Sequence, residues 1–266
     1  MIKRVIVTRP PRESQDWLRE LSAAGLDAVA LPLIEIRPLD DPAPVQRAWL
    51  ALSNYAGMMF VSANAVDGFF ASRPPSALSF GANESIKTRA WATGPGTVAA
   101  LRRGGVAPQC IDAPPVDAVQ FDSEALWQRV GPLVRGGRRV LIVRGSDGQH
   151  DSANHGVGRD WFAQQVRDAG ATVEFLVSYQ RARPGLDAAQ LRLARAAAAD
   201  GSVWLFSSSE AVSHLLASLP GQDWQAARAV ATHARIAAAA RQAGFGRVHE
   251  SRPAVADILV SIESMS

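Results

Sequence analysis

Residues 89–106 read RAWATGPGTVAALRRGGV, and residues 228–245 read RAVATHARIAAAARQAGF. Each stretch begins with a short apolar run, passes through a turn that contains threonine, and ends in an amphipathic segment that stops near a glycine. This order is typical of a β-strand followed by an α-helix. Because the two stretches share much of their sequence, they predict an internally duplicated α/β fold.

Other segments repeat in the same order along the chain. The further pairs are IVTRP (6–10) with IVRG (142–145), MMFVSANAV (58–66) with VWLFSSSEAV (203–212), and, more loosely, 114–130 with 252–264. Trp17 and Trp161 match across the copies and are expected in the core. The chain is therefore interpreted as a duplicated unit.

The clearest apolar runs each precede an expected helix: VIV (5–7), MMFV (58–61), VLIV (140–143) and VWLF (203–206). Runs that are apolar on both faces and alternate with helices indicate parallel strands covered on both sides. The predicted fold is α/β, with two similar doubly wound parallel-sheet lobes. A plain tandem would place residues 1–134 in one lobe, but the first strand-helix-strand segment can also join the sheet of the second copy.

Two long extended segments bear on how the lobes are connected. ALPLIEIRPLD (30–40) and VEFLVSYQRARPGLD (173–187) both end in proline followed, directly or after a glycine, by Leu-Asp. They predict a two-stranded connector between the lobes, with a hinge. The polar, glycine-rich segment 147–158 is expected to be a mobile surface loop or a lid.

Composition excludes several classes of protein. The formal charge of the 266 residues is only +3, and the 28 basic residues are spread along the chain, so no nucleic-acid partner is expected. The single cysteine, Cys110, excludes an internal disulfide and favours a reducing compartment. The N-terminus has no signal-like apolar region, and no apolar run is long enough to span a membrane, so the protein is predicted to be cytoplasmic, without a membrane partner.

The common cofactor motifs are missing from the sequence. GPG at 94–96 lacks the rest of a dinucleotide fingerprint, there is no Walker A lysine or Gly-x-Ser-x-Gly elbow, and the histidines show no metal spacing. We therefore expect neither a cofactor nor a metal.

Hydroxyl side chains stand at the expected strand-to-helix junctions. They are Thr8, Ser62, Thr93, Thr97, Ser207, Ser208, Ser209 and Thr232. The carboxyl ends of parallel strands bring such residues beside helix N-termini, whose free N–H groups bind anions. Each residue is also open to a second interpretation, as a helix N-cap.

Charged and aromatic residues add to these junctions. Arg9 and Arg144 occupy equivalent positions, each expected directly after a strand, where a guanidinium can bind a carboxylate or form a structural ion pair. Tyr179, on the expected connector, is either a proton donor or a packed aromatic residue. His233 stands where the first copy has Gly94.

Taken together, the motifs resemble the uroporphyrinogen-III synthase family over nearly the whole chain. The pieces that carry the resemblance are VTRP (7–10), FVSANAV (60–66), WATGPGTVAAL (91–101), VLIVRG (140–145), VSYQRARP (177–184), FSSSEAV (206–212) and ATHARIAAAARQAGF (231–245). The resemblance implies two lobes joined by a two-stranded ladder, the first lobe being made from both chain ends. It therefore favours residues 1–35 with 185–266 as one lobe, 41–172 as the other, and 36–40 and 173–184 as connector strands.

The resemblance also implies a substrate and a reaction. The substrate is hydroxymethylbilane, a polycarboxylate linear tetrapyrrole, which is closed with loss of water and inversion of ring D, without metal or cofactor. Tyr179 would assist departure of the hydroxyl. Thr8 and Arg9 match the opening motif of the family. Together with the other junction residues, the expected substrate-binding residues are Thr8, Arg9, Ser62, Ala63, Asn64, Thr93, Gly94, Thr97, Arg144, Gly145, Ser207, Ser208, Ser209, Thr232 and His233. His233 departs from the glycine usual in the family, and a transient contact with the preceding pathway enzyme is also expected.

Two alternatives stay open at this point. A noncatalytic two-lobed protein that binds an anionic solute would share the fold, although neither a signal peptide nor a DNA-binding helix-turn-helix supports it. A chain that keeps the fold and has lost the activity would bind the tetrapyrrole without turnover.

Overall fold

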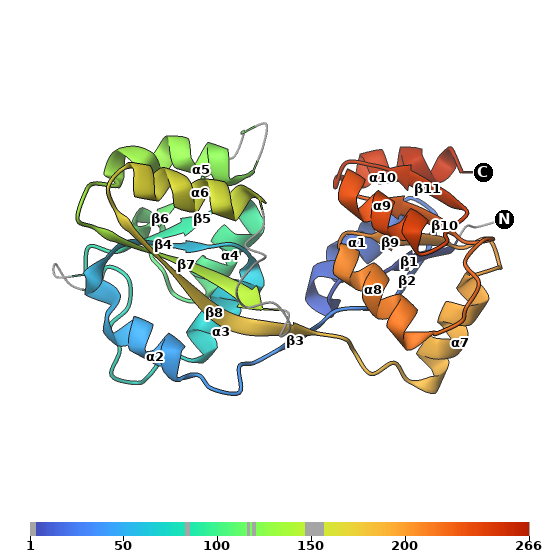
Figure 1. Cartoon of the computed structure of the whole chain (residues 1–266), viewed down its shortest axis with the longest axis horizontal. Coiled ribbons are helices and arrows are strands. Elements are labelled where there is room, and N and C mark those ends of the chain that lie inside the picture. Colours follow the sequence, from blue (N-terminus) through green and yellow to red (C-terminus); the bar gives the residue numbers. More distant parts are fainter. Residues whose placement is uncertain (1–3, 83–85, 116–117, 119–120, 147–156, 266) are drawn as a thin grey trace. The chain divides into compact units, whose positions relative to one another are not determined.

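The computed structural model describes residues 4–265 except 83–85, 116–117, 119–120 and 147–156. The chain divides into two compact units, which are described separately (Figure 1). Unit 1 consists of Met1–Glu35 and Ala182–Ser266, and unit 2 of Ile36–Arg181. The chain therefore passes from one unit to the other twice.

Unit 2 is built on a sheet whose strand order is β3-β8-β7-β4-β5-β6. Its strands are β3 (Glu35–Arg37), β4 (Tyr55–Phe60), β5 (Arg89–Ala92), β6 (Ile111–Asp112), β7 (Arg139–Ser146) and β8 (Thr172–Ala182). From β8 to β6 every neighbouring pair is parallel.

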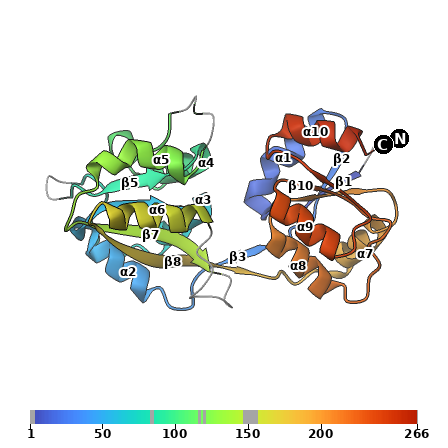
Figure 2. The same ribbon diagram turned by 45° about the horizontal axis from the view of Figure 1, so that its top comes forward.

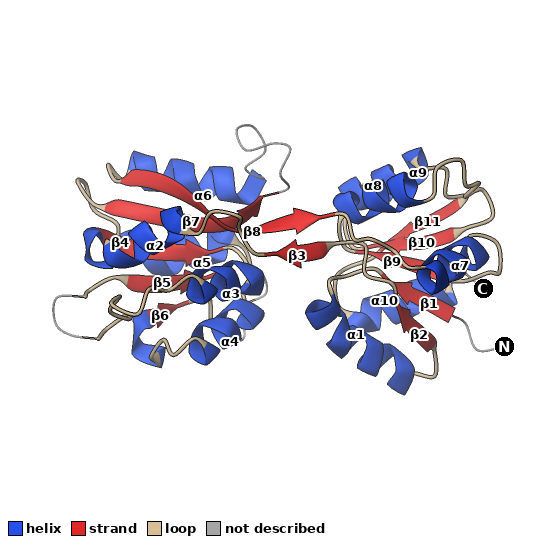
Figure 3. Ribbon diagram, turned by 90° about the horizontal axis from the view of Figure 1, so that it is seen from below, coloured by secondary structure: helices blue, strands red, loops and turns tan. Residues whose placement is uncertain are grey.

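Helices cover both faces of this sheet. They are α2 (Ala43–Leu50), α3 (Ala63–Ala71), α4 (Pro95–Arg103), α5 (Ser123–Val130) and α6 (Val157–Asp168), with short 3₁₀ turns at Leu52–Asn54, Pro108–Cys110 and Gly131–Leu133. Trp49 of α2 and Phe69 of α3 are buried in one core cluster, and Phe162 of α6 is buried in another. Helices α3 and α4 pack side by side, as do α5 and α6 (Figures 1 and 3).

Unit 1 has a five-stranded, fully parallel sheet with the order β11-β10-β9-β1-β2. The strands are β1 (Arg4–Val7), β2 (Asp27–Ala30), β9 (Val203–Phe206), β10 (Arg228–Ala231) and β11 (Arg247–Glu250). The helices are α1 (Pro11–Ala23), α7 (Ala188–Ala197), α8 (Ser209–Ser218), α9 (Ala234–Gln242) and α10 (Val255–Glu263). Helices α1 and α10 cover one face and α8 and α9 the other (Figures 2 and 3).

The five strands of the unit 1 sheet correspond to five of the six strands in unit 2, β3 having no counterpart among the described residues of unit 1. Order β2-β1-β9-β10-β11 in unit 1 matches β8-β7-β4-β5-β6 in unit 2, and the repeated sequence segments fall on the matching strands. The predicted fold, two similar doubly wound parallel sheets, is thereby confirmed. Because β1 pairs with β9, the sheet of unit 1 is formed by segments from both parts of the chain that flank unit 2.

Glycine ends several of these helices. Gly25 after α1, Gly105 after α4 and Gly244 after α9 all have positive φ, between 83° and 94°. This left-handed conformation costs a residue with a Cβ free energy, and it turns the chain back toward the next strand. The repeated glycine in the sequence therefore has the same structural cause in both units.

The expected connector differs in part from what the structure shows. Strand β8 pairs with β7 from Thr172 to Gln180, so most of the segment 173–184 is a full strand of the unit 2 sheet rather than a free ladder. Strand β3, from the other extended segment, lies at the edge of the same sheet beside β8. Of the expected loop 147–158, residues 147–156 lie outside the described part of the chain, and helix α6 begins at Val157.

Candidate functional site

Each sheet contains a pair of neighbouring strands whose following helices cover opposite faces. In unit 1 the pair is β1 and β9, which lead into α1 and α8, and in unit 2 it is β7 and β4, which lead into α6 and α3. At the carboxyl ends of such a pair the two connections diverge, which is where doubly wound sheets bind ligands. The predicted residues Thr8, Arg9 and Ser207 follow the first pair, and Ser62 follows β4 in the second.

Thr8 ties together the ends of the unit 1 pair. Its side chain is buried, and its hydroxyl donates to the carbonyl of Leu205 at 2.8 Å. This bond joins β1 to β9 one residue beyond their last ladder contact. Thr8 is therefore a structural residue at this junction and fixes the position from which Arg9 extends.

Arg9 is the cation at the unit 1 junction. Its Nε donates to the Ser207 hydroxyl at 3.0 Å, and its guanidinium carbon lies 4.3 Å from the centroid of the Trp17 ring. Glu13 Oε2 lies 4.0 Å from the same Nε. Burial lowers the pKa of Arg9, and Glu13 opposes this effect. A guanidinium remains protonated well above neutral pH, so Arg9 presents a partly desolvated positive charge.

The adjacent helix starts of unit 1 are capped by side chains. Ser208 accepts a hydrogen bond from the N–H of Glu210 at 3.2 Å, at the start of α8. His233 Nδ1 accepts from the N–H of Arg235 at 3.1 Å, at the start of α9, and its ring is exposed. Ser209 is the first residue of α8, and Thr232 lies between β10 and the cap. His233 thus caps α9, the role that was weighed for the serines, whereas Gly94, at the equivalent position, provides no side-chain cap for α4.

In unit 2, Ser62 and Tyr179 meet at the second junction. The Ser62 hydroxyl caps α3 by accepting from the N–H of Ala65 at 3.2 Å, and it lies 3.4 Å from the Tyr179 hydroxyl. Tyr179 is only 5% exposed, and its ring belongs to the core of unit 2. The ring packs on Gly145, where an added Cβ would lie 2.4 Å from it. Tyr179 therefore reaches the junction through its hydroxyl, with its ring immobilised by packing.

Arg144 was expected directly after a strand, and this expectation is wrong. Arg144 and Gly145 lie within β7, which continues to Ser146, and Arg144 is 6% exposed. The long β8 explains the difference, because it supplies pairing partners for β7 as far as Gln180, whereas β1 ends where the four-residue β2 ends. The Arg144 guanidinium carbon lies 5.6 Å from the centroid of the Phe175 ring.

The remaining predicted residues lie near the starts of α3 and α4 in unit 2. Ala63 and Asn64 open α3, and Thr93 and Gly94 connect β5 to α4. Thr97 is buried within the first turn of α4. The structure thus places the predicted residues at or near the carboxyl ends of the strands, with Arg144 and Gly145 inside β7 and Thr97 in the first turn of α4.

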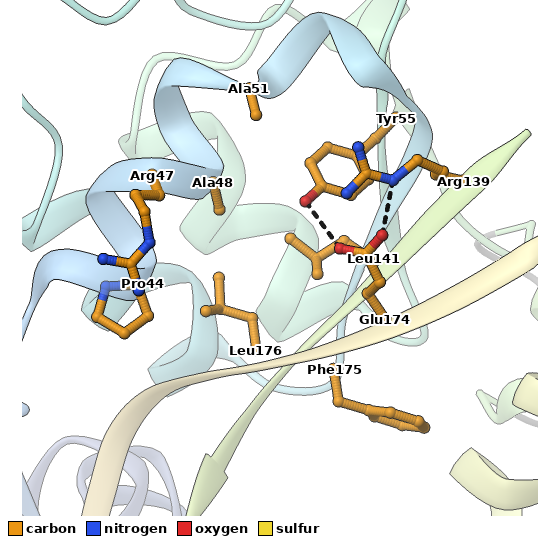
Figure 4. Close-up of a pocket in the computed structure, with 10 residues that line it drawn as sticks. All are labelled: Pro44, Arg47, Ala48, Ala51, Tyr55, Arg139, Leu141, Glu174, Phe175 and Leu176. Atoms are coloured by element: carbon orange, nitrogen blue, oxygen red, sulfur yellow. Dashed lines mark hydrogen bonds and ion pairs between the residues drawn. The ribbon is translucent and has the colours of Figure 1, made fainter.

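A hollow of about 280 Å³ lies elsewhere in unit 2, where β4, β7 and β8 begin (Figure 4). Its walls come mainly from α2 and these strands, and they contain none of the predicted site residues. On one side, the Tyr55 hydroxyl donates to Glu174 at 3.2 Å and Arg139 Nε donates to Glu174 at 2.6 Å (Figure 4). This cluster lies near the amino ends of the strands, whereas Ser62 lies beyond their carboxyl ends.

The cluster at Glu174 shifts the pKa of each member. The hydrogen bond from Arg139 is the main reason why the pKa of Glu174 lies below its usual value, and the same bond raises the pKa of Arg139. Burial, together with the charge of Glu174, raises the pKa of Tyr55. Sequence reasoning missed this cluster because its members are separated by up to 119 residues and carry no motif.

Neither a metal site nor a membrane-spanning helix is present in the described part of the chain. Within the described ranges no group of three or more His, Cys, Asp or Glu side chains is placed to hold a metal ion. In the same part of the chain every helix is too short or too polar to cross a lipid bilayer.

Known proteins of one family match this chain. The family model described as uroporphyrinogen-III synthase HemD matches residues 15–260. A uroporphyrinogen-III synthase of Chlorobaculum parvum is 30% identical over 191 residues, which are 71% of this chain and 68% of that protein. A second one, of Synechococcus elongatus, is 24% identical over 231 residues, 84% of this chain and 78% of that protein.

Solved structures agree with the fold. The uroporphyrinogen-III synthetase of Helicobacter pylori has a TM-score of 0.56 at 15% identity, covering 100% of both chains. A mutant uroporphyrinogen III synthase of Thermus thermophilus has a TM-score of 0.54 at 14% identity, covering 99% of this chain and 98% of that one. These likenesses concern the fold, and the family model covers most of the sequence. The resemblance read from the sequence is confirmed: the chain belongs to the uroporphyrinogen-III synthase family.

Proposed function

We propose that this chain closes hydroxymethylbilane to uroporphyrinogen III, with inversion of ring D and loss of one water. The observation that carries this proposal is the family match over residues 15–260. The geometry supports it, because the carboxyl edges of both sheets offer hydrogen-bond donors and, in unit 1, a partly buried cation, suited to a substrate with many carboxylates.

In the proposed reaction the terminal hydroxyl leaves as water once it has received a proton. The azafulvene cation that results is attacked by the already substituted carbon of ring D, which gives a spiro intermediate, and rearrangement of this intermediate inverts the ring. Because the linear substrate also closes spontaneously without inversion, the enzyme acts chiefly by orienting it and by stabilising charge.

Arg9 is the proposed anchor of a substrate carboxylate. Its side chain is 26% exposed, so it is partly desolvated and still reachable. A charge-assisted bond to a carboxylate in such a place is stronger than one in open solvent. N–H groups at the starts of α3, α4 and α8 are proposed to bind further carboxylates.

Tyr179 is the proposed proton donor. Its phenol lies 3.4 Å from the Ser62 hydroxyl, at the junction where α3 begins. A phenol can transfer its proton to a departing hydroxyl and recover it from the surroundings after the ring has closed. Packing of its ring on Gly145 holds the hydroxyl in place.

The test is isomer analysis of the product. The purified protein is given freshly generated hydroxymethylbilane without metal or cofactor, and the oxidised porphyrins are separated by chromatography. Mostly isomer III, formed faster than in a buffer blank, supports the proposal. Isomer I alone at the blank rate contradicts it and favours the noncatalytic binding protein instead.

Two further parts of the proposal come from the sequence alone. We place the enzyme in the cytoplasm, and we expect a transient contact with the enzyme that supplies its unstable substrate. Cell fractionation tests the first, and chemical cross-linking to that enzyme tests the second.

A further inference from the structure

The side chain of Arg9 is held from two sides by groups that belong to different elements. The Trp17 ring, from α1, lies 4.3 Å from the guanidinium carbon, and the Ser207 hydroxyl, after β9, accepts from Nε at 3.0 Å. Trp17 itself is 7% exposed and packs in a core cluster with Val5 and Leu21. Its position is therefore fixed independently of Arg9.

This arrangement determines which edge of the guanidinium is offered to a ligand. The hydrogen bond to Ser207 and the ion pair with Glu13 both involve Nε of Arg9. Within the described part of the chain, Nη1 and Nη2 form no hydrogen bond and no ion pair. A carboxylate binds arginine with two parallel hydrogen bonds, along either the Nε–Nη edge or the Nη1–Nη2 edge. With Nε occupied, the Nη1–Nη2 edge is the one that remains.

We propose that Trp17 and Ser207 are positioning residues that aim the Nη1–Nη2 edge of Arg9 at a substrate carboxylate. This inference rests on the proposed function. It assigns a role in substrate binding to Trp17, which the sequence alone indicates to be a core residue. Trp17 supplies a π-face that restricts the plane of the guanidinium, and Ser207 fixes its rotation within that plane.

The experiment is a double-mutant cycle on KM and kcat. Trp17→Leu and Ser207→Ala are made in the natural chain and in an Arg9→Ala background, with the formation of isomer III as the readout. Each change should raise KM, Trp17→Leu by about fivefold, while kcat changes less than twofold. In the Arg9→Ala background neither change should raise KM further, because there is no guanidinium left to position.

Controls separate this role from packing. Trp17→Phe keeps an aromatic face and should restore most of the affinity. Trp224→Leu makes the same chemical change at another buried tryptophan of unit 1, which stacks on Phe245 and not on an arginine, so it should lower stability without changing KM. Ser207→Ala removes only a hydroxyl and gives a second reading if Trp17→Leu does not fold.

The outcomes are distinct. If Trp17→Leu and Ser207→Ala raise KM by the same factors with and without Arg9, or if both leave KM unchanged in the natural chain, the positioning role is wrong. If Arg9→Ala leaves KM unchanged, Arg9 does not bind the substrate and the inference is overturned, although the reaction still proceeds. If the natural chain forms no isomer III, the proposed function itself has failed.

Discussion

At the scale of single residues, matching positions in the two units have different roles. Arg9 follows its strand and is partly exposed, whereas Arg144 lies within its strand and is buried. Their equivalence was predicted from sequence, but their exposure was not, because it depends on how far the neighbouring strand extends. Likewise the contact of Arg9 with Trp17 depends on the turn between β1 and α1, which periodicity does not describe.

Replacing Arg9 tests the anchor directly. Arg9→Ala should lower kcat/KM about tenfold to a hundredfold, because a charge-assisted hydrogen bond contributes about 1.5–3 kcal/mol. The measurement is the steady-state rate of isomer III formation. The matched control is Arg4→Ala, which removes a cation at the opposite end of β1 that is paired with Asp27 in solvent. An equal loss in both variants would show that only the overall charge matters.

Removal of the phenol oxygen tests the role of Tyr179 as proton donor. Tyr179→Phe should lower kcat about a hundredfold, in keeping with the loss of general acid catalysis, while KM and the melting temperature change little. The aromatic ring, which fills the core, is kept. Ser62→Ala serves as the comparison, because it removes the neighbouring hydroxyl and the α3 cap. It should lower the free energy of unfolding, and it should lower kcat less than Tyr179→Phe does. An unchanged turnover in Tyr179→Phe would remove the tyrosine from the mechanism.

At the scale of elements, the apolar runs predicted the central strands, and the two long extended segments predicted the neighbouring strands β3 and β8, where the chain passes between the units. Strands β1, β4, β7 and β9 are largely buried, so the central run of residues in each is apolar. Strand β8 has a mixed pattern of exposure because it lies near an edge of its sheet. Its segment was interpreted as a connector because it is long and extended and ends, like 30–40, in proline before Leu-Asp. Tyr179 lies on β8, the strand predicted as a connector, and its ring belongs to the core of unit 2.

Because β7 passes close to the Tyr179 ring at Gly145, this position should not tolerate a larger side chain. Gly145→Ala would place a Cβ 2.4 Å from that ring and should lower the free energy of unfolding by about 2 kcal/mol. Gly96→Ala, at a helical glycine of the same unit with nothing within 4 Å, should be neutral or slightly stabilising. Urea denaturation measures both. In a Tyr179→Ala background the cost of Gly145→Ala should largely disappear, and an undiminished cost would show that the ring is not its cause.

The ion pair that joins β7 to β8 predicts a dependence of stability on pH. The folded-state pKa of Glu174 lies below its usual value, mainly through the hydrogen bond from Arg139. The stabilisation is therefore complete above the ordinary carboxyl pKa of about 4.3 and is lost as the pH falls through the lower folded-state value. Since the pair is partly exposed, Glu174→Gln should cost only about 0.5 kcal/mol at neutral pH.

This dependence is measured by urea unfolding of both proteins at a series of pH values from neutral to acidic. The difference between Glu174→Gln and the natural chain should shrink as the solution becomes acidic. A difference that stays constant over the whole range would mean that the carboxylate charge is not involved.

At the scale of the whole molecule, the two units differ in how the chain forms them. Unit 2 is one continuous segment with its own core clusters, whereas unit 1 needs both Met1–Glu35 and Ala182–Ser266. The repeat in the sequence predicted that the sheets would match, since equivalent strands carry similar residues. The repeat left the tandem and the discontinuous arrangements open, because repetition does not specify which strands pair.

Fragments test this division. Residues 36–181 alone should fold cooperatively, because their sheet and both core clusters come from that segment, whereas residues 182–266 alone should remain largely unfolded without β1 and β2. Circular dichroism and dispersion of amide NMR signals distinguish the two states. An unfolded 36–181 fragment would mean that unit 2 depends on unit 1.

The pairing of β1 with β9 has a consequence for synthesis on the ribosome. Strand β1 spans Arg4–Val7, and its partner β9 begins only at Val203. At about 5–20 residues per second, the nascent β1 waits on the order of 10–40 s for that partner. During this interval all of unit 2 emerges, so β1, which is translated before unit 2, belongs to the unit that completes its folding after it.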